Sequence, residues 1–109
     1  MTGLHAYKHP GLLLKKQVLP GLQLTVSQAA KDLGITRQTL HRILAGQHAI
    51  TADMAVRLER LCGVPSKYWL EYQQAHDLAK ASNTNKIFLR SIPSRRLPRA
   101  VLLEMGLRD

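Results

Sequence analysis

Two short amphipathic segments joined through a single glycine constrain the fold of this chain more than any other feature. In the first segment, apolar residues recur at the i, i+3, i+4, i+7 spacing of one helical face: Val26, Ala29, Ala30 and Leu33. Thr25 and Gln28 have the spacing of a capping box, so Thr25 is expected to open this helix. Gly34 is expected to end it in a left-handed conformation.

The second segment begins two residues after Gly34. Thr36 is its expected N-cap, and Gly46 is expected to close it. Its apolar stripe consists of Leu40, Ile43 and Leu44. A small residue at the crossing (Ala30) and a glycine in the turn are typical of a helix-turn-helix, in which the second helix projects into a major groove of DNA. Residues 25–46 are therefore the predicted reading unit.

The polar face of the second helix carries side chains suited to base recognition. Arginine can pair twice with guanine and glutamine twice with adenine, whereas hydroxyl groups suit phosphates. Residues that open the first helix are expected to touch the flanking DNA backbone. The candidate DNA-binding residues are Ser27, Gln28, Thr36, Arg37, Gln38, Thr39, His41 and Arg42. The alternative is an ordinary helical hairpin with a solvated polar face.

The charge of the chain supports a polyanionic partner. The 109 residues include 16 Lys and Arg against 7 Asp and Glu, a formal net charge of +9. The excess lies in residues 1–46 and 83–109, whereas residues 47–82 carry four basic and four acidic groups. Basic groups near phosphates release condensed counterions, so this distribution favours one nucleic-acid face. The alternative is a basic protein whose charge serves only solubility.

The rest of the chain reads as further helices, which predicts an all-α domain of five helices. The first helix begins near Pro10 and is expected to stop at Pro20-Gly21. The fourth runs from Thr51 to Gly63, and the fifth from Pro65-Ser66 to about Ala81. Residues expected to face inward on these last two helices are Met54, Leu58, Leu61, Cys62 and Trp69. Tyr72 fits core packing and a partner surface equally well.

Residues 83–109 are expected to form a basic, partly structured tail behind a domain of residues 9–82 and an N-terminal arm of residues 1–8. Ser82 to Asn85 is a cluster of helix-breaking residues. Ile87 to Leu89 fits a short strand, and Ala100 to Leu107 fits one or two helical turns. The tail is a candidate for contact with DNA.

The sequence argues against an enzyme, a metal site or a cofactor. It has no nucleophile–base set, no pair of catalytic carboxylates and no glycine-rich phosphate loop. Its five histidines lack metal-ligand spacing, and His9 is expected to be a cap or a packing residue. Cys62 is the only cysteine, so no internal disulfide can form. Without a secretory signal or a transmembrane run, we expect a cytoplasmic protein.

The stretch from His9 to Ala81 resembles the HigA (VapI-type) antitoxins, within the XRE class of helix-turn-helix proteins. The runs that carry the resemblance are His9-Pro10-Gly11, Leu33-Gly34, Ala45-Gly46, Ile50 to Ala55, Tyr68-Trp69-Leu70 and Gln73 to Ala79. The resemblance implies a lambda-repressor-like fold and a homodimeric repressor encoded beside a toxin. It also implies two partners: a palindromic operator in double-stranded DNA, and a HigB toxin, which is a RelE-like ribonuclease.

Within the resemblance, Thr36 to Arg42 fall where relatives contact DNA, except that Leu40 faces the core. HigB-like toxins are usually basic, and a basic tail would repel such a partner. A stand-alone regulator without a toxin therefore stays open as an alternative, as does a protein-interaction module.

Overall fold

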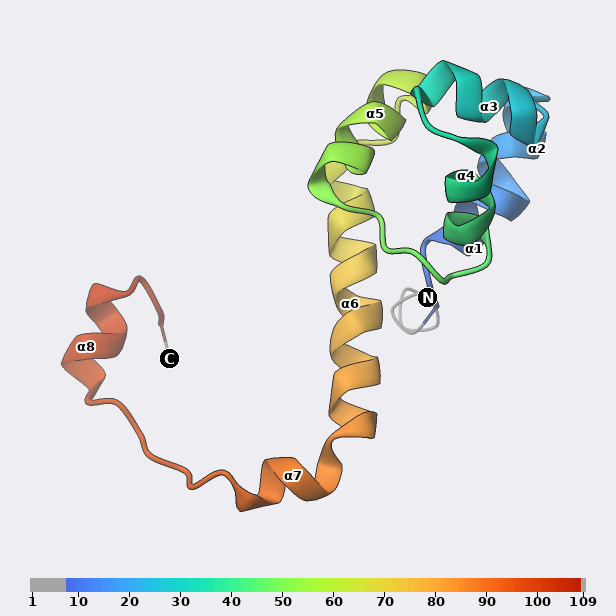
Figure 1. Ribbon diagram of the computed structural model, residues 1–109. Coiled ribbons are helices and arrows are strands. Elements are labelled where there is room, and N and C mark those ends of the chain that lie inside the picture. Colours follow the sequence, from blue (N-terminus) through green and yellow to red (C-terminus); the bar gives the residue numbers. More distant parts are fainter. Residues whose placement is uncertain (1–7, 109) are drawn as a thin grey trace.

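A computed structural model describes residues 8–108 of the chain. The elements in chain order are α1 (Gly11–Leu13), η2 (Leu14–Val18), α2 (Leu19–Leu22), α3 (Val26–Leu33), α4 (Arg37–Leu44), α5 (Ala52–Cys62), α6 (Ser66–Thr84), α7 (Lys86–Ser91) and α8 (Arg99–Glu104). No strand occurs within residues 8–108, so the expected all-α class is confirmed. The elements from α1 to α5 form a bundle, and α6 leads away from it toward α7 and α8 (Figure 1).

The first predicted helix runs without a break from Gly11 to Leu22, and its middle part, η2, is π-helical. The expected stop at Pro20-Gly21 is wrong. Pro20 lies at the start of α2, where its missing N–H is tolerated. In a regular α-helix its ring would clash with the Lys16 carbonyl, and the wider π-helical turn η2 lies at this point of the chain. The helix ends instead at Gln23, which adopts φ 55°. The Leu24 N–H then closes the turn on the Leu19 carbonyl (3.0 Å).

The helix starts and stops of the reading unit lie where the sequence predicts them. Thr25, Thr36 and Thr51 are N-caps whose hydroxyls accept backbone N–H groups at 3.0–3.2 Å. Gly34, Gly46 and Gly63 all have positive φ and follow α3, α4 and α5. The capping box is only half formed, because the Gln28 amide donates to Asp32 Oδ1 (2.7 Å) instead of returning to Thr25.

One aliphatic core joins the elements from η2 to α6. Its largest fully buried side chains are Leu14, Leu40, Ile43, Ile50, Leu58 and Trp69. Leu61 and Cys62 are half-buried at its edge. Trp69 is a core residue as expected, and Tyr72 is 8% exposed, so packing is what this structure assigns to its side chain. Within residues 8–108, no helix combines the length and the apolar character needed to cross a membrane.

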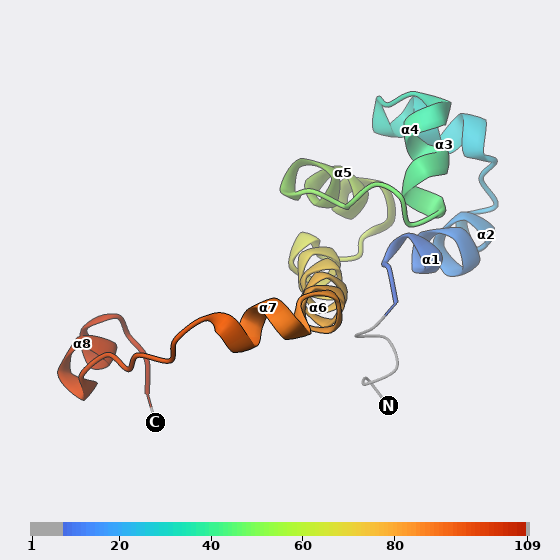
Figure 2. The same cartoon turned by 60° about the horizontal axis from the view of Figure 1, so that its bottom comes forward.

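Two expectations for the C-terminal segment are wrong. Ile87 to Leu89 lie in helix α7, because no neighbouring strand is available to pair with them. Helix α6 runs past Ala81 to Thr84, where the Thr84 hydroxyl donates to the Lys80 carbonyl (2.7 Å). Both α7 and α8 lie apart from the bundle in two views of the molecule (Figures 1 and 2). The expected arm lies outside the described residues, apart from Lys8.

Candidate nucleic-acid interface

The outward face of α4 is a row of free polar side chains. Arg37, Gln38, His41 and Arg42 are all exposed, while Leu40, Ile43 and Leu44 on the other side of the helix are buried. The structure gives none of these four polar side chains a hydrogen-bond or ion-pair partner within residues 8–108. Their donors and acceptors are therefore available to a ligand without breaking an internal contact.

The threonines at the start of α4 are less free than their sequence positions indicate. The Thr36 hydroxyl accepts the Thr39 N–H (3.0 Å) and donates to Thr39 Oγ1 (2.9 Å). Thr39 is half-buried as a result of this position. The backbone N–H groups of Arg37 and Gln38 lie in the first turn of α4, where a helix offers them no carbonyl acceptor of its own. They give this helix end an affinity for anions that does not depend on the hydroxyls.

Ser27 and Gln28 are both exposed in the first turn of α3. The Gln28 amide is held by Asp32 Oδ1, one helical turn further along. Contact with a phosphate would require this amide to leave the carboxylate. Ser27 thus has the more accessible polar group of the two.

The turn before α4 is fixed by an arginine from a later helix. Arg57 Nη1, on α5, donates to the Leu33 carbonyl at 2.8 Å and lies 3.4 Å from the Gly34 carbonyl. Asp53 forms an ion pair with Arg57 Nε at 3.1 Å, which orients the guanidinium. These bonds satisfy carbonyls that the end of α3 leaves without an intrahelical partner. Sequence reasoning missed Arg57, because the contact spans 24 residues.

The other end of α4 is fixed by the start of the chain's first helix. The backbone of Gly11 lies so close to the Ile43 carbonyl oxygen that a side chain at position 11 would overlap it. His9 packs beside Gly46, the residue that reverses the chain after α4. Helix α4 is thus held at both ends by residues outside the predicted reading unit.

His9 serves as a cap and as a packing residue, which confirms the expectation from sequence. Its Nδ1 accepts the Gly11 N–H (2.9 Å), and its ring meets the edge of the His76 ring with centroids 5.1 Å apart. Only 8% of the residue is exposed. Burial lowers the pKa of His9 below its ordinary value, and the neighbouring His76 lowers it further, against the opposing effect of Asp77.

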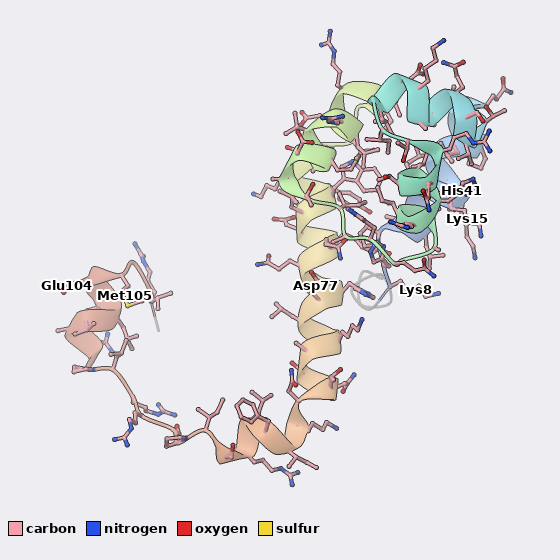
Figure 3. The ribbon with its side chains drawn as sticks, viewed as in Figure 1. Lys8, Lys15, His41, Asp77, Glu104 and Met105 are labelled. Atoms are coloured by element: carbon pink, nitrogen blue, oxygen red, sulfur yellow. The ribbon has the colours of Figure 1, made fainter. Side chains whose placement is uncertain are left out.

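A lysine from the first helix lies beside the reading face. Lys15 and His41 line the same shallow groove between η2 and α4, and both point away from the bundle (Figure 3). The excess positive charge of residues 1–46 includes this part of the chain, but no local sequence pattern identifies Lys15. Among residues 8–108, no group of histidine, cysteine or acidic side chains is arranged to hold a metal ion.

Comparison with known proteins places this geometry in a family. Residues 14–69 match the model of the HTH_3 family, described as helix-turn-helix. The chain belongs to this family. It is a helix-turn-helix DNA-binding protein of the XRE class, with the lambda-repressor-like fold, and the family is one of DNA-binding proteins rather than of enzymes.

Within the helix-turn-helix family, the similar proteins include antitoxins and virulence-associated proteins. Virulence-associated protein A' of Dichelobacter nodosus is 38% identical over 73 residues, which are 66% of this chain and 63% of that protein. The chain thus spans a little under two thirds of the length of this relative. The structure of Pseudomonas aeruginosa antitoxin HigA with the higBA promoter is 28% identical, with a TM-score of 0.75, and the match covers 83% of this chain and 98% of that one. An addiction module antidote protein of the HigA family from Coxiella burnetii is 30% identical, with a TM-score of 0.72, covering 81% and 97%.

Proposed function

We propose that this protein is a sequence-specific transcriptional repressor that occupies a palindromic operator at its own promoter as a symmetric dimer. The observation that carries the proposal is the row of exposed, unpartnered Arg37, Gln38, His41 and Arg42 on a helix fixed at both ends. A similar antitoxin was solved with the higBA promoter, and another similar protein with its operator DNA.

In this proposal, the N-terminal half of α4 enters the major groove. Arg37 and Gln38 read base edges, since they lie in the first turn, while His41 and Arg42 contact bases or phosphates one turn further along. Thr36 and Thr39 cap the helix and direct its N–H groups to a phosphate. Ser27 and Gln28 touch the flanking backbone. Lys15 adds a phosphate contact beside His41.

A dimer follows from the requirements of operator recognition. One helix of this length contacts only a few base pairs, whereas two copies place their recognition helices in successive major grooves, about 34 Å apart. Repression then consists of occupying the promoter. Its affinity is expected to fall steeply with salt, because basic side chains displace counterions from the phosphates.

The second half of the proposal is that the protein neutralises a HigB-like toxin, a RelE-like ribonuclease encoded beside it. The similarity to HigA antitoxins supports this partner. The test is co-expression with the small basic protein encoded by the adjacent gene. Co-purification of the pair, and relief of growth arrest by this chain, are the expected results. Without such a neighbour or without co-purification, the protein is a stand-alone regulator.

The test of DNA reading is a binding titration with labelled promoter DNA and a scrambled duplex of equal length. Arg37→Ala and Gln38→Ala are each expected to lose about 1–3 kcal/mol of affinity for the promoter and to relax its base preference. Lys67→Ala is the matched control, since Lys67 is an exposed cation on α6, away from α4. Unchanged affinity and selectivity of both α4 variants would overturn the assignment.

A further inference from the structure

The segment that follows the bundle exposes most of the large apolar side chains of the molecule. Within residues 8–108, thirteen large hydrophobic residues are exposed, and ten of them lie between Leu78 and Leu107. Ile87 is 85% exposed, Phe88 66% and Met105 63%. Neither α7 nor α8 contains a buried residue. In a monomer, this apolar surface would remain in water.

Such a segment is not expected to hold its conformation without a covering partner. Each of α7 and α8 has six residues, which is well below the length at which an isolated helix is stable in water. Contiguous exposed apolar surface on a soluble protein commonly marks an interaction site. The chain's own bundle does not provide the cover, because α7 and α8 lie away from it in both views (Figures 1 and 2).

Helix α6 carries a surface that fits this segment. A shallow groove along one side of the helix is lined by Leu70, Gln73, Gln74, Asp77, Leu78 and Ala81. Leu70, Leu78 and Ala81 provide an apolar stripe at helical spacing, which is the surface against which a second helix packs. Asp77 places a carboxylate at the edge of the groove.

The structure places residues 83 and 84 of the predicted tail in α6, so from here on the tail means residues 86–108. We propose that the tail of one copy packs on the α6 groove of a second copy, and that the exchange is reciprocal. The tail provides Lys86 and five arginines, with Glu104 as the single acid among its described residues. Its charge is thus complementary to Asp77 at the groove. The partners of a standard interface contribute about 20–30 residues a side, and the tail together with one groove reaches that size.

This inference rests on the dimer of the proposed function and names its surface. The tail lies on the far side of α6 from α4, so DNA reading and dimer formation use separate parts of the chain (Figure 1). An exchange of this kind is isologous, because each copy offers the same tail and the same groove. It gives a closed pair, which is the symmetry that a palindromic operator requires.

The first experiment measures oligomeric state by sedimentation equilibrium of the full chain. The wild type is expected to be a dimer, and Phe88→Asp to dimerise about tenfold more weakly or worse, because a carboxylate replaces an aromatic anchor. Val56→Asp is the control, since Val56 is 60% exposed but lies on α5 outside the tail and the groove. It is expected to dimerise as the wild type does. Equal dimerisation of the wild type and Phe88→Asp overturns the inference.

The second experiment tests whether the contact joins two chains. In a Cys62→Ser background, one preparation carries Leu78→Cys and another carries Phe88→Cys. Mixing them under mild oxidation is expected to give a disulfide between the two variants in preference to either alone, because each tail meets the other copy's groove. No preferential cross-link overturns the inference.

A third measurement separates this inference from the proposed function. Binding of Phe88→Asp to a DNA half-site should match the wild type, while its binding to the full operator should lose cooperativity. Failure of the wild type to bind either DNA overturns the proposed function alone. A dimeric wild type that Phe88→Asp does not weaken overturns the inference alone, whereas a wild type that is monomeric at all concentrations overturns the inference together with the dimer of the proposed function. If that monomer binds vesicles of anionic lipid through the tail, the occupant is a membrane surface instead.

Discussion

Gly11 and Ile43 meet backbone to backbone, and this contact fixes the C-terminal end of recognition helix α4. No side chain fits between them, because a Cβ on Gly11 would overlap the carbonyl oxygen of Ile43. The same glycine donates its N–H to His9 Nδ1 (2.9 Å). One residue near the start of the described chain therefore joins the first helix to the reading helix.

Gly11→Ala is expected to lower the free energy of unfolding by about 1–3 kcal/mol, because the backbone of Ile43 cannot move aside as a flexible side chain would. Urea denaturation followed by circular dichroism measures the change. Gly21→Ala is the matched control, since Gly21 is helical and a Cβ there would meet nothing within 4 Å. It should raise stability by about 0.5–1 kcal/mol. Equal effects of the two substitutions would contradict the close contact.

Arg57→Ala should remove the donor that satisfies the Leu33 carbonyl in the turn before α4. We expect a loss of about 1 kcal/mol, which is below the usual range for a hydrogen bond to a charged group because the guanidinium is partly exposed. Arg57→Ala should also lose more promoter affinity than a variant that is equally destabilised at a site away from α4, because α4 loses the contact that orients it.

Asp53→Asn, measured in the same assay, distinguishes the contribution of the Asp53–Arg57 ion pair from that of the Arg57 bond to the Leu33 carbonyl. Asp53 is mostly exposed, so its loss should cost at most about 0.5 kcal/mol. Arg57→Ala removes both the ion pair and the bond to the Leu33 carbonyl. Equal effects of Asp53→Asn and Arg57→Ala would therefore show that the salt bridge, and not the bond to Leu33, holds the turn.

The lowered pKa of His9 predicts that stability depends on pH. Burial is the main cause of this shift, followed by the charge of His76. Between the folded pKa and about pH 6.5, the unfolded chain binds more protons than the folded one. The stabilisation is thus complete above about pH 6.5 and is lost as the pH falls through the folded pKa of His9.

His9→Asn tests this pH dependence, since its amide oxygen can still accept the Gly11 N–H but does not titrate. The variant should show a flatter dependence of the unfolding free energy between pH 8 and 5. His41→Asn, at an exposed position on α4, should retain the wild-type dependence. Parallel curves for the wild type and His9→Asn would remove His9 as the source.

Lys15→Ala is expected to weaken binding to specific and scrambled DNA alike. If Lys15 contacts one phosphate, the slope of log K against log salt should become less negative by about one. Fluorescence anisotropy at four salt concentrations measures the slope. Lys67→Ala should leave it unchanged, and an unaltered slope for Lys15→Ala would place that side chain away from the DNA.

The parts of the fold that were predictable are those fixed by neighbours in sequence. Thr36 caps α4 through the N–H of Thr39, three residues away, and Gly34 turns the chain because its backbone can adopt positive φ. The expected stop at Pro20 is wrong for a related reason, since the rule that proline ends a helix gives no account of a π-helical turn just before it. The strand expected at Ile87 to Leu89 is a helix in the structure. A strand needs a partner strand, and the local sequence does not show whether one is available.

The candidate site divides in the same way. The exposed face of α4 follows from the helical period, so Arg37 and Arg42 were identifiable in advance. The residues that orient this helix were not. Arg57 reaches the Leu33 carbonyl across 24 residues, and Gln73 Oε1 accepts the Ile50 N–H across 23. Contacts at such separations depend on the packed fold and leave no periodic signal.

The double attachment of α4 limits how the protein can be re-engineered. Residues 25–46 contain every base-reading side chain that we propose, yet Gly11 and Arg57, which orient the helix, lie outside that range. Transplanting residues 25–46 alone into a foreign scaffold would therefore transfer the base-contacting side chains without the contacts that orient their helix. Exchanging the exposed residues of α4 within the intact chain preserves both supports, and is expected to change the target sequence while the scaffold stays the same.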